Sequence, residues 1–238
     1  MLRPFFLSLG ALLISACASS VSSQKQQCTA TIAPPANTIH IIDKPIDFGQ
    51  KRIALTKAYI QKHYGKKVNT IAITPRIILL HYTAIDSLSG SYNTMKPQTL
   101  HGGRKDIAKA SALNVSVQFL IDKDGTIYRL MPETWMGRHV IGLNYYAIGV
   151  ENVAKDAAHL TPAQVKANIA LVRYLKHKYP TIDYLIGHHE YRRMESTPLW
   201  LEKDKGYRTV KYDPGVTFMR KVRAGVRDLD LKEPPKGK

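Results

Sequence analysis

The sequence predicts an α/β fold, a single domain built around a central mixed β-sheet that is flanked by helices. Segments typical of strands alternate with segments typical of helices along the chain. The segment Arg76–Tyr82 carries four consecutive apolar residues, which is typical of a strand buried on both faces. A chain of 238 residues with 44% apolar and 8% aromatic residues is long enough to bury a sizeable core.

The first expected elements are a helix, a strand and a hairpin. The spacing predicts a helix over residues 52–64, and the strand Arg76–Tyr82 follows it. Two apolar segments, Val115–Ile121 and Thr126–Leu130, flank the turn sequence Asp122–Gly125 and therefore predict a β-hairpin.

A helix in the second half has a clear start and stop. Thr161 is a candidate N-cap, Pro162 occupies the first helical position, and Pro180 ends the pattern. The other expected elements are strands at Ala147–Asn152 and Asp183–Gly187 and a closing helix at Val216–Val226.

The N-terminus has the features of an export signal over residues 1–16. Arg3 is followed by an apolar run at Phe5–Ile14, which is too short to span a bilayer. The sequence Ile14-Ser15-Ala16-Cys17 resembles the lipobox of bacterial lipoproteins, in which the cysteine is acylated; we expect palmitate among the acyl groups on Cys17. The alternative is a signal peptide that is cut elsewhere, with an incidental cysteine.

The residues after Cys17 suggest where the protein is anchored. No Asp follows Cys17, and in Gram-negative lipoproteins an Asp there marks retention in the inner membrane, so this resemblance implies the periplasmic face of the outer membrane, with the inner membrane less expected. Residues 17–38 are rich in Ser, Gln, Thr, Ala and Pro and predict a lipidated flexible tether of roughly 25 Å. We expect the folded domain over residues 39–231 and a loose tail over residues 232–238.

The charge of the chain favours an acidic partner. The formal net charge is +17, from 35 basic and 18 acidic residues. Nucleic acid, anionic lipid and an anionic cell-wall polymer all fit such a charge, and so does a solvated surface that merely happens to be basic. The export signal argues against nucleic acid.

Cys28 has no cysteine partner in the mature chain other than Cys17. We also expect the protein to be a monomer.

Three segments carry residues suited to a metal. His81 and His188 each follow a predicted strand, and Asp213 lies in a turn two residues after Lys211. Two imidazoles and a carboxylate suit Zn²⁺ and leave a coordination position for water. Taken singly, each histidine also fits a packed or surface residue, and Asp-Pro-Gly is a common turn. His189 adjoins His188, and because strand neighbours point to opposite faces, only one of them is expected in the site.

These segments resemble the type 2 N-acetylmuramoyl-L-alanine amidase family, which includes the peptidoglycan recognition proteins, over roughly residues 39–218. The resemblance rests on several ordered motifs: His81-Tyr82-Thr83, Ile148-Gly149-Val150-Glu151, Gly187-His188 and Lys211-Tyr212-Asp213-Pro214-Gly215, together with the hairpin segment 116–129. It implies an amidase-like α/β fold that hydrolyses the amide between N-acetylmuramic acid and L-alanine in peptidoglycan or muropeptides. The relatives with the most similar organisation are lipoprotein amidases of the Gram-negative outer membrane.

The same resemblance assigns roles to individual residues. It implies His81, His188 and Asp213 as ligands of Zn²⁺, Glu151 as the catalytic acid–base, and Lys211 as the group that stabilises negative charge. It also places further side chains in the substrate groove, which are His139 and Asn144, and we expect Arg138 to bind a peptide carboxylate through a bidentate pair.

The segment 190–210 departs from the family pattern because it is longer than the usual loop there. Its basic and aromatic residues fit either a substrate-specificity loop or a packed addition without substrate contact. Two non-catalytic alternatives remain, a lipoprotein that binds peptidoglycan without cutting it and a basic structural lipoprotein. A zinc protease is disfavoured because the chain has no HExxH motif.

Overall fold

The computed structural model describes residues 1–2, 39–100 and 105–236. The described residues from 39 onward belong to one compact unit. The predicted lipid site at Cys17 and the predicted tether lie outside the described residues.

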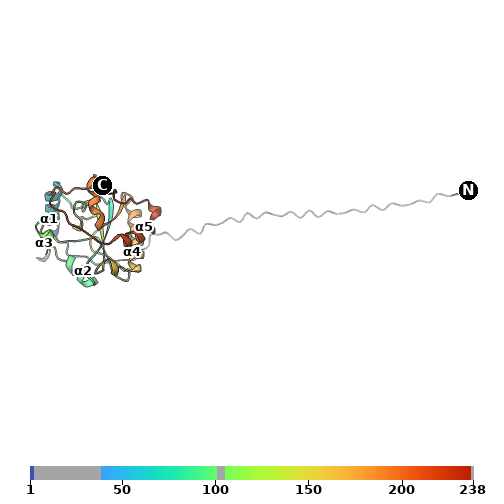
Figure 1. Ribbon diagram of the computed structural model, residues 1–238, viewed down its shortest axis with the longest axis horizontal. Coiled ribbons are helices and arrows are strands. Elements are labelled where there is room, and N and C mark those ends of the chain that lie inside the picture. The colour runs from blue at the N-terminus through green and yellow to red at the C-terminus, as the bar shows by residue number, and fades with distance from the viewer. Residues whose placement is uncertain (3–38, 101–104, 237–238) are drawn as a thin grey trace. The chain divides into compact units, whose positions relative to one another are not determined.

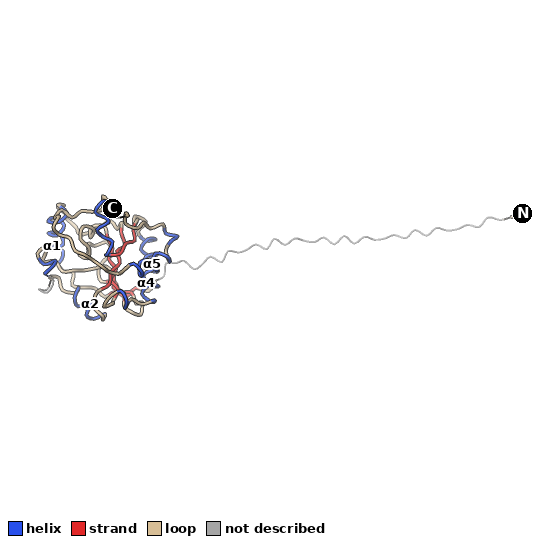
Figure 2. The backbone as a smooth tube through the Cα atoms, viewed as in Figure 1, coloured by secondary structure: helices blue, strands red, loops and turns tan. Residues whose placement is uncertain are grey.

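A mixed six-stranded sheet forms the centre of this unit, as predicted (Figure 2). The strand order is β1-β4-β3-β5-β2-β6, and only β3 and β4 are antiparallel neighbours. This pair is the hairpin predicted from the turn Asp122–Gly125. The strands are β1 (Ile41–Asp43), β2 (Ile77–Tyr82), β3 (Phe119–Ile121), β4 (Ile127–Arg129), β5 (Ala147–Asn152) and β6 (Tyr184–Gly187).

Helices flank this sheet, as predicted, and Figure 1 shows α4 and α5 close together. The α-helices are α1 (Gln50–Tyr59), α2 (Leu88–Met95), α3 (Lys105–Ala108), α4 (Pro162–Lys178) and α5 (Val216–Ala224); α1 continues into a π-helical turn, η1 (Ile60–Tyr64). The 3₁₀ turns are η2 (Ala157–His159), η3 (His188–Ser196) and η4 (Arg227–Leu229).

The start of α4 follows directly from its sequence. The Thr161 side chain accepts from the Gln164 backbone N–H, and the Gln164 side chain accepts in return from the Thr161 N–H. This reciprocal capping box satisfies two donors that a helix start leaves unpaired. Pro162 occupies the first turn, where the missing N–H costs nothing.

The central strand β2 separates two apolar layers. Ile77 and Leu79 pack in the core cluster that contains α1 and η1 residues, whereas Ile78 and Leu80 pack in the cluster that contains α4 and α5 residues. Successive strand residues point to opposite faces, so His81 continues the row of Ile77 and Leu79. The fold therefore directs His81 to the α1 side of the sheet.

Residues 232–235, within the predicted loose C-terminal tail, form hydrogen bonds with the folded domain. Lys232 extends the edge of the sheet beside β6: its N–H donates to Asp183 O over 2.8 Å, and its carbonyl accepts from Leu185 N over 3.0 Å. Arg193 donates to the carbonyls of Pro234 and Pro235 over 2.8 and 2.7 Å. These bonds to backbone carbonyls fix a segment whose composition alone suggests mobility.

Candidate metal centre and active site

Three strand ends bring the candidate side chains together. β2, β5 and β6 run parallel, so their carboxyl ends meet at one edge of the sheet. In the register of these strands His81 is paired with Glu151, and Leu80 is paired with Gly187. His188 follows β6 immediately and thus lies beside His81, although 107 residues separate them in sequence.

His81, His188 and Asp213 form a small triangle of potential ligand atoms. The Nδ1 atoms of the two histidines lie 3.0 Å apart, and each lies 3.0 Å from Oδ2 of Asp213. Both histidines are buried, and the Asp213 side chain is 13% exposed. Among the residues that the structure describes, this is the group of His, Cys, Asp or Glu side chains found close enough to share a metal ion.

A neighbouring histidine fixes the tautomer of His81. The Ala147 carbonyl only accepts hydrogen bonds, so the proton of His139 lies on Nε2, 3.4 Å from that oxygen. Burial lowers the pKa of His139 well below its ordinary value, and the charges of His81 and His188 act in the same direction. The neutral His139 ring therefore accepts at Nδ1 from Nε2 of His81 over 3.0 Å. In a neutral His81 ring this arrangement leaves a lone pair on Nδ1.

These residues fit a bound divalent cation. His81 Nδ1 and a carboxylate oxygen of Asp213 lie 3.0 Å apart, close enough to bind one divalent cation when Nδ1 carries no proton. In a tetrahedral zinc site with bonds of about 2.1 Å the ligand atoms are about 3.4 Å apart, which is near the observed spacing. Two imidazoles and one carboxylate also match the ligands that zinc takes in hydrolytic sites.

The protonation states suit metal binding at neutral pH. Burial lowers the pKa of His188 to about 4; the Asp213 carboxylate opposes this shift, and the charges of His81 and Lys211 add to it. His188 is then neutral and available as a ligand. Burial raises the pKa of Asp213, but the two histidines outweigh this effect and hold it well below its ordinary value. Asp213 is therefore a carboxylate.

His189 hydrogen-bonds to the backbone of Asp213, a role that the sequence did not suggest. Its backbone N–H donates to the Asp213 carbonyl over 2.8 Å, and its Nδ1 lies 3.1 Å from the same oxygen. As predicted, only one of the two adjacent histidines joins the triangle, and it is His188. The pair thus supplies one potential ligand and one support for another.

Glu190 and Arg223 support the turn that carries His188. Glu190 Oε2 accepts from the Gly187 N–H over 2.8 Å and from Arg223 Nη2 over 2.6 Å. Glu190 is 7% exposed, and burial raises its pKa, but the bonds from Arg223 and Gly187 bring the pKa below its ordinary value. The ion pair therefore ties α5 to the end of β6, where His188 begins η3.

A pocket of about 590 Å³ opens beside the triangle. Glu151 and Lys211 both line it, together with the three potential ligands. Because Glu151 is paired with His81 in the sheet, both side chains project from the same face toward this pocket. The pocket also contains the predicted groove residues, which are Arg138, His139 and Asn144.

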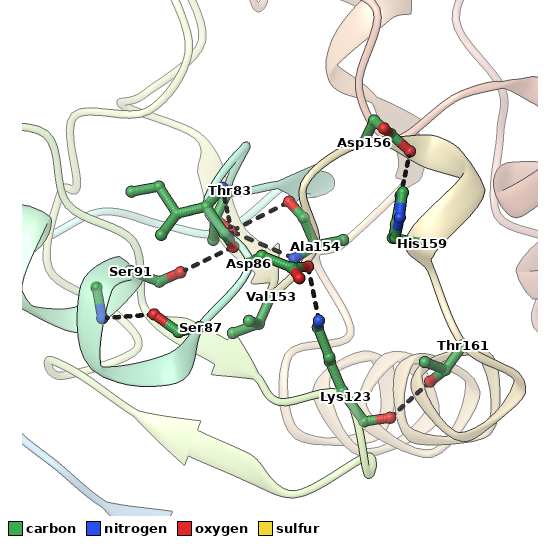
Figure 3. A network of polar contacts seen from close by, with 12 residues as sticks. Thr83, Asp86, Ser87, Ser91, Lys123, Val153, Ala154, Asp156, His159 and Thr161 are labelled. Atoms are coloured by element: carbon green, nitrogen blue, oxygen red, sulfur yellow. Dashed lines mark hydrogen bonds and ion pairs between the residues drawn. The ribbon is translucent and has the colours of Figure 1, made fainter.

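The loop after His81 is fixed by a network around Thr83 (Figure 3). Thr83 Oγ1 donates to Ile85 O over 2.8 Å and accepts from Ala154 N over 3.3 Å. Ala84, which lines the pocket, has a φ of 57°, a conformation that side chains with a Cβ rarely adopt. The Thr83 contacts on both sides hold this strained residue at the pocket wall.

Arg138 donates hydrogen bonds to groups of the protein itself. Its Nη1 donates to the carbonyls of Ser111 and Leu113, and its Nη2 donates to Ile107 O and to the Tyr207 hydroxyl. These four bonds use both terminal nitrogens, so a bidentate pair with a substrate carboxylate is not available in this arrangement. Arg138 instead joins loops that build the pocket wall.

Asn144 shapes the turn that carries His139. Its Oδ1 accepts from the backbone N–H groups of His139 and Val140 over 2.9 and 2.8 Å. Substrate contacts by His139 and Asn144 stay predictions, and both residues have structural roles as well.

Replacing His139 with phenylalanine is expected to weaken zinc binding by about 10–100-fold, because residues that orient metal ligands typically have effects of this size. Phenylalanine keeps a ring against Gly149, where an added Cβ would come within 2.9 Å of His139, but it offers no acceptor to His81. Competition with a chromophoric chelator measures the change. His159→Phe, which removes an exposed histidine bonded to Asp156, is the matched control. Equal zinc affinity in the two variants would contradict the assigned tautomer.

The chain is similar to known proteins in sequence and in fold. Residues 72–215 match the family model described as N-acetylmuramoyl-L-alanine amidase. No curated protein sequence matches the chain. Among solved structures, the N-acetylmuramoyl-L-alanine amidase LysC from Clostridium intestinale URNW is 26% identical with a TM-score of 0.49, and the match covers 82% of this chain and 100% of that one.

Two further structures extend the comparison. The endolysin amidase LysCS from the same organism is 23% identical with a TM-score of 0.50, over 83% of this chain and 99% of that one; it shares the fold. The bumblebee peptidoglycan recognition protein PGRP-SA is 16% identical with a TM-score of 0.43, over 68% of this chain and 98% of that one. The family match spans more than half of the sequence and includes every residue of the triangle, and the chain belongs to the N-acetylmuramoyl-L-alanine amidase family.

Proposed function

We propose that this protein is a zinc-dependent amidase that hydrolyses the bond between N-acetylmuramic acid and L-alanine in peptidoglycan or its fragments. The observation that carries the proposal is the triangle of His81, His188 and Asp213 beside Glu151 and Lys211, in one pocket of a chain of this family. Bound zinc supplies water with a pKa of about 7 and polarises the scissile carbonyl.

The side chains around the triangle divide the remaining work. Glu151 accepts a proton from the attacking water and returns it to the leaving amine of L-alanine, which is general acid–base catalysis. The Lys211 ammonium stabilises the negative charge that develops on the carbonyl oxygen. Support for this placement comes from the position of Lys211, which lines the same pocket as the three potential ligands.

A peptidoglycan-binding protein without catalysis is the alternative function. Members of the wider fold include recognition proteins, and a groove alone suits binding as well as cleavage. The retained pair of Glu151 and Lys211 beside a complete His-His-Asp group favours catalysis, because binding alone requires neither an acid–base nor a metal ligand set.

The test is mass spectrometry of muropeptides incubated with the purified protein and zinc. The expected product is a free peptide with L-alanine at its N-terminus, together with the released sugar. Cleavage within the peptide or between the sugars would replace the proposed reaction by another, and muropeptide binding without cleavage would support the recognition alternative.

We further propose that lipid on Cys17 anchors the protein to the periplasmic face of the outer membrane. The support is the sequence around Cys17 alone. The wild-type protein is expected to associate with membranes whether or not a chelator is present, and Cys17→Ala is expected to lose this association. The N-terminal peptide of the wild type is expected to carry the additional mass of acyl groups. Release of the unmodified wild-type chain into the periplasm would refute this anchoring.

In the part of the chain that the structure describes, no helix is long and apolar enough to cross a membrane.

A further inference from the structure

Two hydrogen bonds connect the ends of the segment that lies between His188 and Asp213. Tyr191, in the first turn of η3, donates its hydroxyl to the Thr209 carbonyl over 2.7 Å. The same hydroxyl accepts from the Thr209 N–H over 2.9 Å. One side chain thus satisfies both backbone groups of a residue 18 positions away, as a neighbouring strand would.

Tyr191 is itself rigidly placed. It is 1% exposed, and its ring lies 5.5 Å from the His188 ring and stacks on Trp200 at 6.0 Å between centroids. Because it contacts His188 on one side and bonds Thr209 on the other, Tyr191 links a potential metal ligand to the segment that carries the next one.

The outer part of the segment is fixed independently. Glu202 accepts from His63 at 3.0 Å, and the Lys203 N–H donates to the His63 carbonyl over 3.0 Å. Leu201 N–H donates to Gly142 O over 2.9 Å. The stretch from Thr209 to Asp213 then crosses the pocket wall with two attachments, Tyr191 at one end and His189 at the other.

Burial alternates along this stretch. Val210 and Tyr212 are 71% and 75% exposed, whereas Thr209, Lys211 and Asp213 are partly buried. A period of two is typical of an extended chain, in which a slip by one residue exchanges the two sets of side chains. The position of Thr209 therefore contributes, together with the His189 bond to Asp213, to keeping Lys211 and Asp213 facing the triangle.

We propose that Tyr191 is a positioning residue that sets the register of the Thr209–Asp213 stretch and so places Asp213 and Lys211 at the metal centre. The part that concerns Lys211 rests on the proposed amidase function. The part that concerns Asp213 rests only on the metal centre and is measured without substrate.

The test compares Tyr191→Phe with Tyr179→Phe in the full-length protein. Tyr179 donates its hydroxyl to Glu133 over 2.8 Å and does not line the pocket, so Tyr179→Phe removes a hydrogen-bonded tyrosine hydroxyl away from the metal centre. The readouts are zinc affinity by chelator competition, the denaturation midpoint in urea, and kcat and KM for a muropeptide.

Both variants are expected to lose stability, and Tyr191→Phe is expected to lose more because it removes two hydrogen bonds. Only Tyr191→Phe is expected to bind zinc more weakly, by about 10-fold, which is the low end of the range for residues that orient metal ligands. At saturating zinc its kcat is expected to fall, with little change in KM. Wild-type zinc affinity in Tyr191→Phe would overturn the inference and leave Tyr191 a structural residue. If the wild-type protein cleaves no muropeptide but the zinc affinities still differ, the amidase proposal fails and the placement of Asp213 by Tyr191 stands.

Discussion

Replacing Asp213 with alanine is expected to abolish zinc binding at micromolar protein concentration. Because hydrolysis needs the metal, muropeptide hydrolysis is expected to be lost as well. Asp213 is the one anionic member of the triangle, and its Oδ2 lies 3.0 Å from both histidine Nδ1 atoms. Without it, a divalent cation would meet two neutral imidazoles only. Loss of a residue that only hydrogen-bonds to a metal ligand lowers metal affinity by about 10–100-fold. Loss of Asp213, itself a potential ligand, is therefore expected to lower the affinity by more than this.

Metal analysis of the dialysed Asp213→Ala variant checks the expectation. Asp156→Ala is the matched control, since Asp156 also pairs with a histidine but lies at the surface beside His159, away from the pocket. The control is expected to retain zinc and activity. Full zinc content in Asp213→Ala would show that the metal binds elsewhere in the chain.

Replacing Glu151 with glutamine is expected to separate zinc binding from catalysis. Glutamine keeps the size and polarity of the side chain but cannot accept the proton of water, so kcat is expected to fall by about 10²–10⁴-fold, the usual contribution of general acid–base catalysis. Glu151 is not a member of the triangle, and zinc affinity is expected to stay at the wild-type value.

Single-turnover kinetics with a defined muropeptide, on zinc-saturated samples, measure this effect. Unchanged muropeptide affinity together with a lost chemical step would identify Glu151 as the acid–base. A variant that hydrolyses at the wild-type rate would remove Glu151 from the mechanism and direct attention to another proton acceptor in the pocket.

Much of the sheet was predictable because its signals are local. The apolar run of β2 and the cap and proline of α4 each specify their element without long-range information. β1 has three residues, and α2 contains Gly90, Ser91 and Asn93, which have weak helix propensity. These elements depend on packing, and pattern reasoning missed them.

The candidate site was predictable only as separate pieces. Strand ends identified His81 and His188, but the register that pairs His81 with Glu151 is a tertiary property with no local signal. The family resemblance supplied the connection. The geometry brings these residues together around one pocket, and their assigned roles stay predictions for the variants above.

The supporting residues were hidden for a related reason. Tyr191 and His189 act through bonds to Thr209 and Asp213, across a segment whose path the sequence does not specify. Arg138 shows the same limit. A charged side chain in a groove motif suggests contact with a ligand, but Arg138 also donates hydrogen bonds to backbone carbonyls, which the sequence does not reveal. A buried guanidinium with such partners has no distinct sequence signature.

Hydrolysis by this protein is expected to depend on a metal held by His81, His188 and Asp213. The most direct test is to strip the purified protein with a chelator and to titrate zinc back while following muropeptide hydrolysis. The stripped protein is expected to show negligible hydrolysis, with recovery that saturates at one zinc ion per chain. Full hydrolysis by metal-free protein would show that the reaction does not use this metal centre.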